Sequence, residues 1–266
     1  MIYLFLIPAL LFLAVFFILP MVRLFFVGGS GSLGWSAYAQ ALINPAYLDA
    51  MLATLGVAAA TTIATLIISG LCGFFLQRHR FPGRRLLVSM LTLPLAFPGV
   101  VVGFMIIMLA GRQGLIGQMT QALGAGKLVF AYSLAGLFLG YVYFSIPRTI
   151  LTIMAATEKL DTRLEEAARS LGASRWHVTC HVILPALRPA FIASGAICFA
   201  TAVSAFGTAF TLATRINVMP MVIYTEFTMS ANIAMAAALS FVLGLVTWCV
   251  LAIARSAGGA TVAAAG

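Results

Sequence analysis

Residues 165–185 read EEAARSLGASRWHVTCHVILP, and they form the longest polar, charge-carrying run of a chain that is otherwise strongly apolar. Of the 266 residues, 63% are hydrophobic and only 8% are charged. Soluble domains carry about 25% charged residues, so this composition indicates an integral membrane protein. The polar run therefore stands out as a segment that lies in water beside the membrane.

Six apolar segments lie around this run, each with about the 20 residues that a helix needs to cross a bilayer. We therefore expect an all-α polytopic fold with one transmembrane domain over residues 1–266. The first segment has no basic start and is too long for a secretory signal, so it is expected to be a span. The third contains two prolines, which predict a bend beside protein or a cavity. The expected spans are residues 1–27, 51–76, 86–110, 128–147, 191–213 and 233–253, followed by a disordered Gly- and Ala-rich tail after Arg255.

The basic residues give a formal net charge of +9, but they lie in short loops between apolar segments and not in a separate basic domain. Membrane topology explains them better than nucleic-acid binding, because cytoplasmic loops keep an excess of Lys and Arg. Eleven of the 15 lie in the 78–85 loop, the 148–188 region and the C-terminal end, and four lie on the opposite side. We therefore expect the polar run and both termini to be cytoplasmic.

The polar run itself predicts two short helices. The first has Asp161 or Thr162 as its N-cap and acidic residues early in the helix, which suit the helix dipole. Gly172 is where a left-handed residue can end it. A second helix is expected over residues 174–183, stopped by Pro185. The element is thus a helix, a turn and a helix at the membrane surface.

The first of these helices carries a small apolar patch formed by Ala167, Ala168 and Leu171, with Glu166 and Arg169 beside it. Small side chains permit another backbone to approach closely, and the charged pair at the edge favours a docking surface for a protein partner. The alternative is an amphipathic element that rests on lipid headgroups, for which the tryptophan and the basic residues serve equally well.

The spacing of this run resembles a known motif. Glu166-Ala167-Ala168, then Gly172, then Val182-Ile183-Leu184-Pro185 is similar to the EAA loop of permease subunits in binding-protein-dependent ABC importers, whose pattern is Glu-Ala-Ala, Gly, then Ile-x-Leu-Pro. The one departure is Val182 in place of Ile. The six spans and the Glu158–Asp161 lead-in also resemble this family, so the resemblance covers most of the chain.

The resemblance implies a type I importer permease with the MetI-like fold, in a bacterial inner membrane, that works by alternating access. The 157–188 loop would couple it to ATP hydrolysis, with Glu166, Ala167, Ala168 and Gly172 as coupling residues. The implied partners are two ATP-binding subunits, a second permease subunit, a periplasmic or surface solute-binding protein and membrane lipid. The chain most resembles the branch that handles polyamines, ferric iron, phosphonates and sulfate, and a polyamine-type or organophosphonate solute is expected.

The chain is not expected to be an enzyme or to hold a cofactor. Gly126-Lys127 is followed by Leu128 and lacks the upstream glycine of a phosphate loop. ATP and Mg are therefore expected to bind to the partner ATPase subunits.

Hydroxyl side chains recur at intervals of three or four residues in the fifth expected span, so we expect them on one helical face. Such a stripe can line a water-filled path, although small and hydroxylated residues are also enriched where membrane helices pack. The candidate pathway residues are Thr201, Ser204, Thr208 and Thr211, with Phe206 and Gly207 beside them, and Pro94 and Pro98 of the bent third span.

The main alternative function is a secondary transporter driven by an ion gradient. Such proteins usually hold an ionisable side chain near the middle of the membrane, and the centres of the expected spans contain no Asp, Glu, Lys, Arg or His. His177 and His181 lie four residues apart, but without a third ligand we expect surface contact and not a metal site. Glu226 is expected to be a solvated loop charge and not a contact for a cationic solute or a binding protein.

Overall fold

The computed structural model describes residues 2–212 and 216–257, and this part of the chain contains helices and no strand. The expected all-α fold is confirmed. Six helices within the described residues are long and apolar enough to cross a membrane. They are Leu6–Gly28, Pro45–Arg78, Gly99–Ala122, Leu134–Glu158, Arg175–Ser204 and Ile233–Ser256. The last residue of the fifth expected span and most of the expected tail fall on residues 213–215 and 258–266, which lie outside the described part.

The chain forms two compact units, which are described one at a time. The first comprises Met1–Thr54 and Asn217–Cys249, and the second comprises Leu55–Ile216 and Val250–Gly266. The long helices α4 (Pro45–Arg78) and α14 (Ile233–Ala257) contribute to both. The expected single transmembrane domain stays a prediction.

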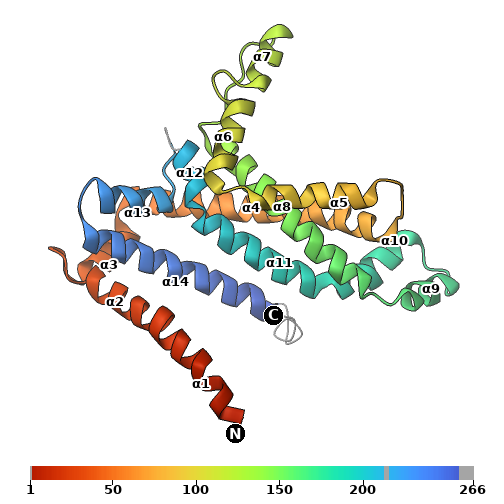
Figure 1. The fold of residues 1–266 in the computed structure, drawn as a ribbon, viewed down its shortest axis with the longest axis horizontal. Helices are drawn as coiled ribbons and strands as arrows, with labels where there is room; N and C mark the ends of the chain where they lie inside the picture. Colours follow the sequence, from red (N-terminus) through yellow and green to blue (C-terminus); the bar gives the residue numbers. More distant parts are fainter. Residues whose placement is uncertain (1, 213–215, 258–266) are drawn as a thin grey trace. The chain divides into compact units, whose positions relative to one another are not determined.

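The first unit, whose helices α1, α2, α3 and α13 are labelled in Figure 1, is held together by an aromatic cluster. The Tyr38 hydroxyl donates a 2.6 Å hydrogen bond to the carbonyl of Phe25. Both rings lie against Trp35 and Phe241. Burial raises the pKa of Tyr38, so the hydroxyl remains a donor. The helices of this unit are α1 (Ile2–Leu13), a π-helical turn (Ala14–Ile18), α2 (Leu19–Gly28), α3 (Ser36–Ile43), α13 (Met219–Thr228) and parts of α4 and α14.

Glu226 lies on α13 and not in a loop. Its carboxylate accepts a 2.9 Å hydrogen bond from the Tyr47 hydroxyl of α4, and the side chain is half-buried. The expected solvated loop charge is therefore wrong. A proline at the start of α13 explains the helix, since proline suits the first turn, where its missing N–H costs nothing.

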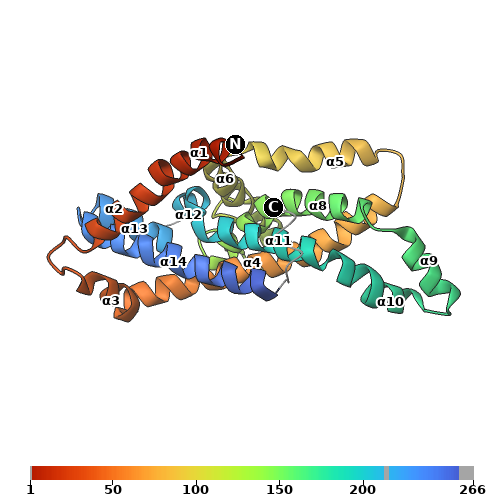
Figure 2. The ribbon, with the colours of Figure 1, turned by 90° about the horizontal axis from the view of Figure 1, so that it is seen from below.

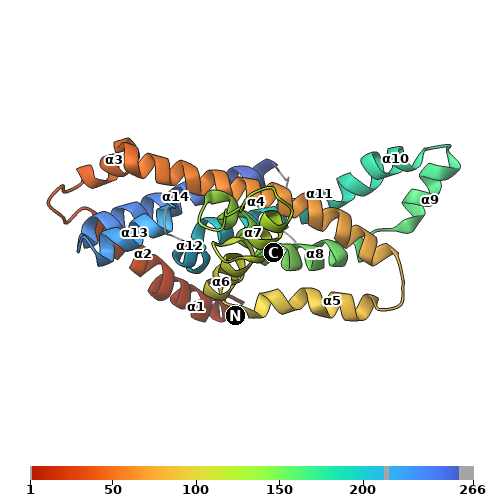
Figure 3. The same cartoon turned by 90° about the horizontal axis from the view of Figure 1, so that it is seen from above.

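The second unit is built around α8, which packs against α11 and α6, while α12 packs against α6 and α8. Figures 2 and 3 show α9 and α10 together at one end of this unit, beyond α8 and α11. Its helices are α5 (Arg84–Thr92), a 3-10 turn (Leu93–Ala96), α6 (Gly99–Ala110), α7 (Leu115–Ala122), α8 (Leu134–Glu158), α9 (Thr162–Ser170), α10 (Arg175–Val178), a π-helical turn (Thr179–Ile183), α11 (Leu184–Ser204) and α12 (Phe206–Leu212).

The third expected span, residues 86–110, is not one bent helix. Pro94 lies in the 3-10 turn after α5, and Pro98 is the extended residue that precedes α6. Proline has no N–H to donate, so two prolines four residues apart interrupt the hydrogen bonding of a helix. The chain then continues through α6 to α7, which lies between the third and fourth expected spans.

The fourth expected span is longer than the sequence predicted. It was expected to end at residue 147, but α8 continues to Glu158 with Pro147 inside it. A proline inside a membrane helix is tolerated when neighbouring groups satisfy the backbone that it leaves free. As a result Arg148, which the charge count placed with the cytoplasmic 148–188 region, lies within a candidate span.

The second short helix of the polar run does not stop at Pro185. It passes from α10 through a π-helical turn, in which the Leu184 N–H donates to the Thr179 carbonyl, directly into α11. Pro185 then occupies the first turn of α11, where a missing N–H is tolerated. The polar run and the fifth span therefore form one continuous helical path.

Thr54 is a buried residue of α4 whose hydroxyl joins two backbone groups. It accepts a 2.7 Å hydrogen bond from the Met219 N–H and donates to the Ala50 carbonyl at 2.6 Å. Thr54→Val removes the acceptor and leaves a buried N–H unsatisfied, which should lower the free energy of unfolding by about 1–3 kcal/mol. Thermal unfolding in detergent measures this.

Thr62→Val is the matched control, because the Thr62 hydroxyl only donates to the Ala58 carbonyl of its own helix. Its melting temperature should stay close to that of the wild type. Equal melting temperatures for the two variants would contradict the bridging role of Thr54.

Candidate functional site

The α9–α10 segment, residues 161–178, has the local structure that the sequence predicts. The Asp161 carboxylate caps α9 by accepting a 3.0 Å hydrogen bond from the Arg163 N–H. Gly172 follows α9 with a φ of 84°, a left-handed conformation that favours glycine. The Ser174 hydroxyl caps α10 by accepting a 3.2 Å hydrogen bond from the His177 N–H.

A buried ion pair anchors α9 to the end of α4. The Glu165 carboxylate binds the Arg78 guanidinium, and Glu165 is 7% exposed. Arg169 lies 3.8 Å from the other Glu165 oxygen, and the Arg78 guanidinium also lies over the Phe74 ring. Sequence reasoning missed this pair. The sequence did contain a signal for it. Glu165 lies three residues before Ala168 of the apolar patch, so the two side chains are on the same helical face.

An apolar cluster lies beneath the same segment. Its buried centre comes from α10, the π-helical turn and α11, and half-buried side chains of α4, α8 and α9 pack around it. The centre fixes the orientation of the two short helices, because a helix of four residues is not stable alone. The buried residues are Val178, Ile183 and Leu187, and the surrounding ones include Phe74, Ala156, Leu160, Ala168, Ala173, Val182 and Phe191.

The outer face of the α9–α10 segment carries three of the four expected coupling residues. Glu166, Ala167 and Gly172 are exposed, whereas Ala168 is half-buried and packs inward. Leu171 is 89% exposed, the largest exposed fraction among the large hydrophobic side chains of the described residues. Trp176 is 77% exposed. An exposed leucine and tryptophan beside a carboxylate form a surface suited to a partner.

The two histidines of this segment stack on each other, with ring centroids 4.0 Å apart. The His181 Nδ1 lies 3.1 Å from the His177 carbonyl of its own helix. Across the described residues, no group of three or more His, Cys, Asp or Glu side chains is arranged to hold a metal ion.

The expected hydroxyl stripe is divided between two helices. α11 ends at Ser204, and Ala205 has an extended backbone before α12 begins. The Ala205 carbonyl accepts a 2.8 Å hydrogen bond from the Tyr141 hydroxyl of α8, which holds the break in place. The prediction of one continuous helical face is therefore wrong, because a break in the helix changes the direction of the side chains that follow.

The hydroxyls of α12 bind the neighbouring helix. Thr208 donates a 2.9 Å hydrogen bond to the Gly99 carbonyl, and Thr211 lies 3.3 Å from the Val100 carbonyl. A Cβ on Gly207 would lie 3.1 Å from the Val100 backbone nitrogen, so the glycine permits this close approach. The α12 part of the stripe thus has the contacts of the packing alternative.

The other candidate pathway residues lie on α11, at the start of α12 and in the segment before α6. Thr201 and Ser204 donate only to carbonyls of α11 itself. Phe206 is 36% exposed at the start of α12, Pro98 is exposed and Pro94 is half-buried.

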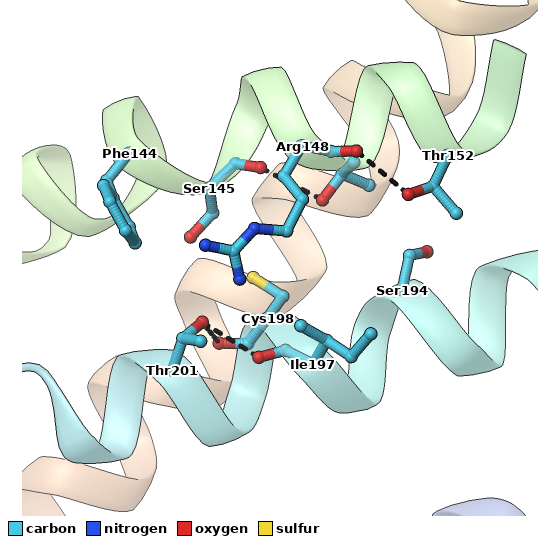
Figure 4. Close-up of a pocket in the computed structure, with 9 residues that line it drawn as sticks. Phe144, Ser145, Arg148, Thr152, Ser194, Ile197, Cys198 and Thr201 are labelled. Atoms are coloured by element: carbon cyan, nitrogen blue, oxygen red, sulfur yellow. Dashed lines mark hydrogen bonds between the residues drawn. The ribbon is translucent and has the colours of Figure 1, made fainter. Parts of the chain in front are cut away.

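A small cavity of about 20 Å³ lies between α8 and α11, and the Arg148 side chain enters it (Figure 4). Its guanidinium points from α8 toward Thr201 and Cys198 of α11 (Figure 4). The sequence predicts no ionisable side chain at the centre of a span, whereas Arg148 lies near the middle of α8, because the helix continues past Pro147. The cavity is lined by Phe144, Ser145, Arg148, Thr149, Thr152, Ser194, Ile197, Cys198 and Thr201.

Comparison with protein-family models places residues 66–257 in the family described as the binding-protein-dependent transport system inner membrane component. The chain belongs to this family. The permease is thus a multi-pass inner-membrane subunit of an ABC importer, as the EAA-like spacing predicted. The matched region includes the whole α9–α10 segment and the cavity around Arg148.

Two relatives from Escherichia coli (strain K12) are similar to this permease. It is 33% identical to the sulfate transport system permease protein CysT over 199 residues, 75% of this chain and 70% of that protein. It is 34% identical to the molybdenum transport system permease protein ModB over 181 residues, 66% of this chain and 78% of that protein.

The fold also matches a solved structure. A chain of the bacterial alginate ABC transporter in complex with an alginate pentasaccharide-bound periplasmic protein superimposes with a TM-score of 0.80. The match covers 98% of this chain and 94% of that chain at 17% identity. The importer permease fold is therefore confirmed.

Breaking the Arg78–Glu165 pair of the permease should release α9. Arg78→Met leaves a buried carboxylate without its partner, which should cost about 3 kcal/mol, at the low end for buried pairs because Arg78 is 22% exposed. Hydrogen exchange of the α9 amides should accelerate, and the melting temperature should fall.

The double variant Arg78→Met, Glu165→Met removes both charges and should recover most of that loss, since an apolar pair can replace a buried ion pair. If the stability losses of Arg78→Met and Glu165→Met, each measured alone, add up to the loss of the double variant, direct coupling of the two side chains is contradicted.

Proposed function

We propose that the permease forms half of the solute pathway of an ABC importer. Its 157–188 loop couples transport to ATP hydrolysis by a cytoplasmic ATPase. The contact is made by Glu166, Ala167 and Gly172 on the outer face of the α9–α10 segment, with Ala168 supporting it from below. ATP and Mg bind to the two partner ATPase subunits. The α9–α10 segment and both termini lie in the cytoplasm.

The observation that carries this proposal is the contrast between the two faces of α9. Its inner face is fixed by the Arg78–Glu165 pair and the apolar cluster, while Glu166, Ala167 and Leu171 are exposed. A rigid, exposed surface can transmit force from a moving partner, whereas a loosely held loop would absorb it. Resting on lipid headgroups, the alternative, needs no such buried ion pair.

The solute pathway also needs partners. In this proposal a second permease subunit, either a copy or a paralogue, completes the pathway, and a solute-binding protein delivers the solute. A fold relative is described in complex with its periplasmic protein, which supports such a partner. Alternating access, driven by closure of the ATPase subunits on the two α9–α10 segments, then opens the pathway to each side in turn.

For the solute we propose a doubly charged tetrahedral oxyanion of the sulfate or molybdate kind. The names of the similar relatives CysT and ModB support this class. They give no support to the polyamine-type or organophosphonate solute that was expected from the sequence. The cavity that Thr201 of the candidate pathway lines also holds a cationic side chain, Arg148, which favours an anion over a polyamine.

An ion-gradient-driven secondary transporter remains the alternative function. Arg148 within α8 is the kind of intramembrane ionisable residue that such transporters use. Membership in an ABC permease family and the exposed EAA-like surface favour ATP as the source of energy.

Charge reversal on the proposed docking surface should separate the permease from its ATPase. Glu166→Lys is expected to lower ATPase binding about tenfold or more, because it replaces an anionic hydrogen-bond acceptor by a cationic donor at the contact. Asp49→Lys makes the same change of charge at an exposed position outside this segment and should leave binding unchanged. Co-purification in detergent and ATP hydrolysis stimulated by loaded binding protein measure the effect. Full stimulation in Glu166→Lys would refute the docking surface.

The solute class is tested with the complete importer in liposomes. ATP-dependent uptake of radiolabelled sulfate or molybdate is expected, whereas labelled spermidine should not accumulate above the level seen without ATP. Uptake of spermidine and of neither anion would contradict the oxyanion proposal. Uptake that follows an imposed ion gradient without ATP would favour the secondary transporter.

A further inference from the structure

We propose that Arg148 is the side chain of this permease that contacts the oxyanion during its passage, at the face where α8 and α11 meet. This inference rests on the proposed solute class. It adds a solute-contacting residue that lies on neither α12 nor the broken third span, where most of the sequence candidates lie.

The first argument is the depth of Arg148 along α8. The helix has 25 residues and Arg148 precedes its last residue, Glu158, by ten, which is about 15 Å at 1.5 Å per residue. The whole helix is about 38 Å long, only about 8 Å more than the hydrocarbon layer. Arg148 therefore lies inside that layer whichever end of α8 protrudes.

The second argument is the absence of a counter-charge. Glu165 is the only carboxylate that forms ion pairs within the described residues, and its partners are Arg78 and Arg169. Arg148 instead lies with its guanidinium carbon 5.5 Å from the centre of the Phe144 ring. A charged side chain at membrane depth is costly and is a functional candidate by default.

The third argument is the chemistry around the guanidinium. The guanidinium carries five N–H donors and no acceptor atom. Several cavity hydroxyls already donate to carbonyls of their own helices, as Thr152 does to Arg148 and Thr201 to Ile197. These hydroxyls therefore offer lone pairs that can hold the cation while no solute is present. A tetrahedral oxyanion offers a stronger partner, because two of its oxygens match the planar fork of an arginine.

The fourth argument is access. Arg148 is half-buried, and next to it Thr152 and Ile197 are exposed on the surface of this chain. A face with a cation cannot lie against lipid tails cheaply, so it faces water or the second permease. The cavity of about 20 Å³ is the size of a single water molecule. In this conformation the Arg148 side chain therefore lies between α8 and α11. It contacts the solute when the surface formed by these two helices opens to the pathway.

The test uses the complete importer in liposomes, with this permease carrying Arg148→Gln, Arg148→Met or Arg148→Lys. Initial rates of labelled sulfate and molybdate uptake, stimulated ATP hydrolysis and melting temperature are measured on the same preparations. The Gln and Met variants should lose uptake about tenfold or more, the size of a lost charged hydrogen bond. Their melting temperatures should not fall, since Met fills the same space without the cost of a charge.

The Lys variant should retain part of the uptake, because it keeps the charge but not the bidentate fork. Arg85→Gln removes one positive charge from the exposed start of α5 and should import at the wild-type rate. Wild-type uptake by Arg148→Met would overturn the inference, and so would a joint loss of uptake and melting temperature in all three variants. If the wild type imports neither anion, the proposed solute fails first and this inference with it.

Discussion

The ion pair between Glu165 and Arg78 is the interaction on which the rest of the second unit depends. It joins the last residue of α4 to the inner face of α9, and it is buried on the α9 side. The apolar cluster around Val178 continues the same attachment into α10 and α11. A partner that pushes on α9 therefore pushes on the ends of two candidate spans at once.

The continuous helix from α10 into α11 is a second connection between the α9–α10 segment and the spans. Because a π-helical turn and not a loop connects them, a displacement of the α9–α10 segment is passed along the axis of α11. α11 packs against α8, and Arg148 lies at that contact. The proposed docking surface and the proposed solute contact are thus connected through α11, which continues from α10 and packs against α8 at Arg148.

The sequence predicted those features that depend on local chemistry. The cap at Asp161 and the left-handed Gly172 follow from short-range backbone rules, and the structure confirms them. The number of spans and the permease family were likewise accessible, because composition and motif spacing determine them. The break between α5 and α6 at Pro94 and Pro98 could have been foreseen from the lost hydrogen bonds.

The features that were missed depend on tertiary contacts. Proline both ends and continues helices, so Pro147 and Pro185 could not be assigned without knowing what packs beside them. The break at Ala205 is fixed by the Tyr141 hydroxyl, 64 positions away in the sequence. The choice of Glu165 as the buried member of two adjacent glutamates likewise follows from the position of Arg78.

The central claim is that the outer face of α9 is the surface on which the ATPase acts. Hydrogen exchange of the permease with and without its ATPase subunits tests this most directly, because it reports each segment separately. The account predicts slower exchange on ATPase binding for amides in residues 162–176 and no change for α7, residues 115–122. Slower exchange confined to α7, with residues 162–176 unaffected, would contradict the account.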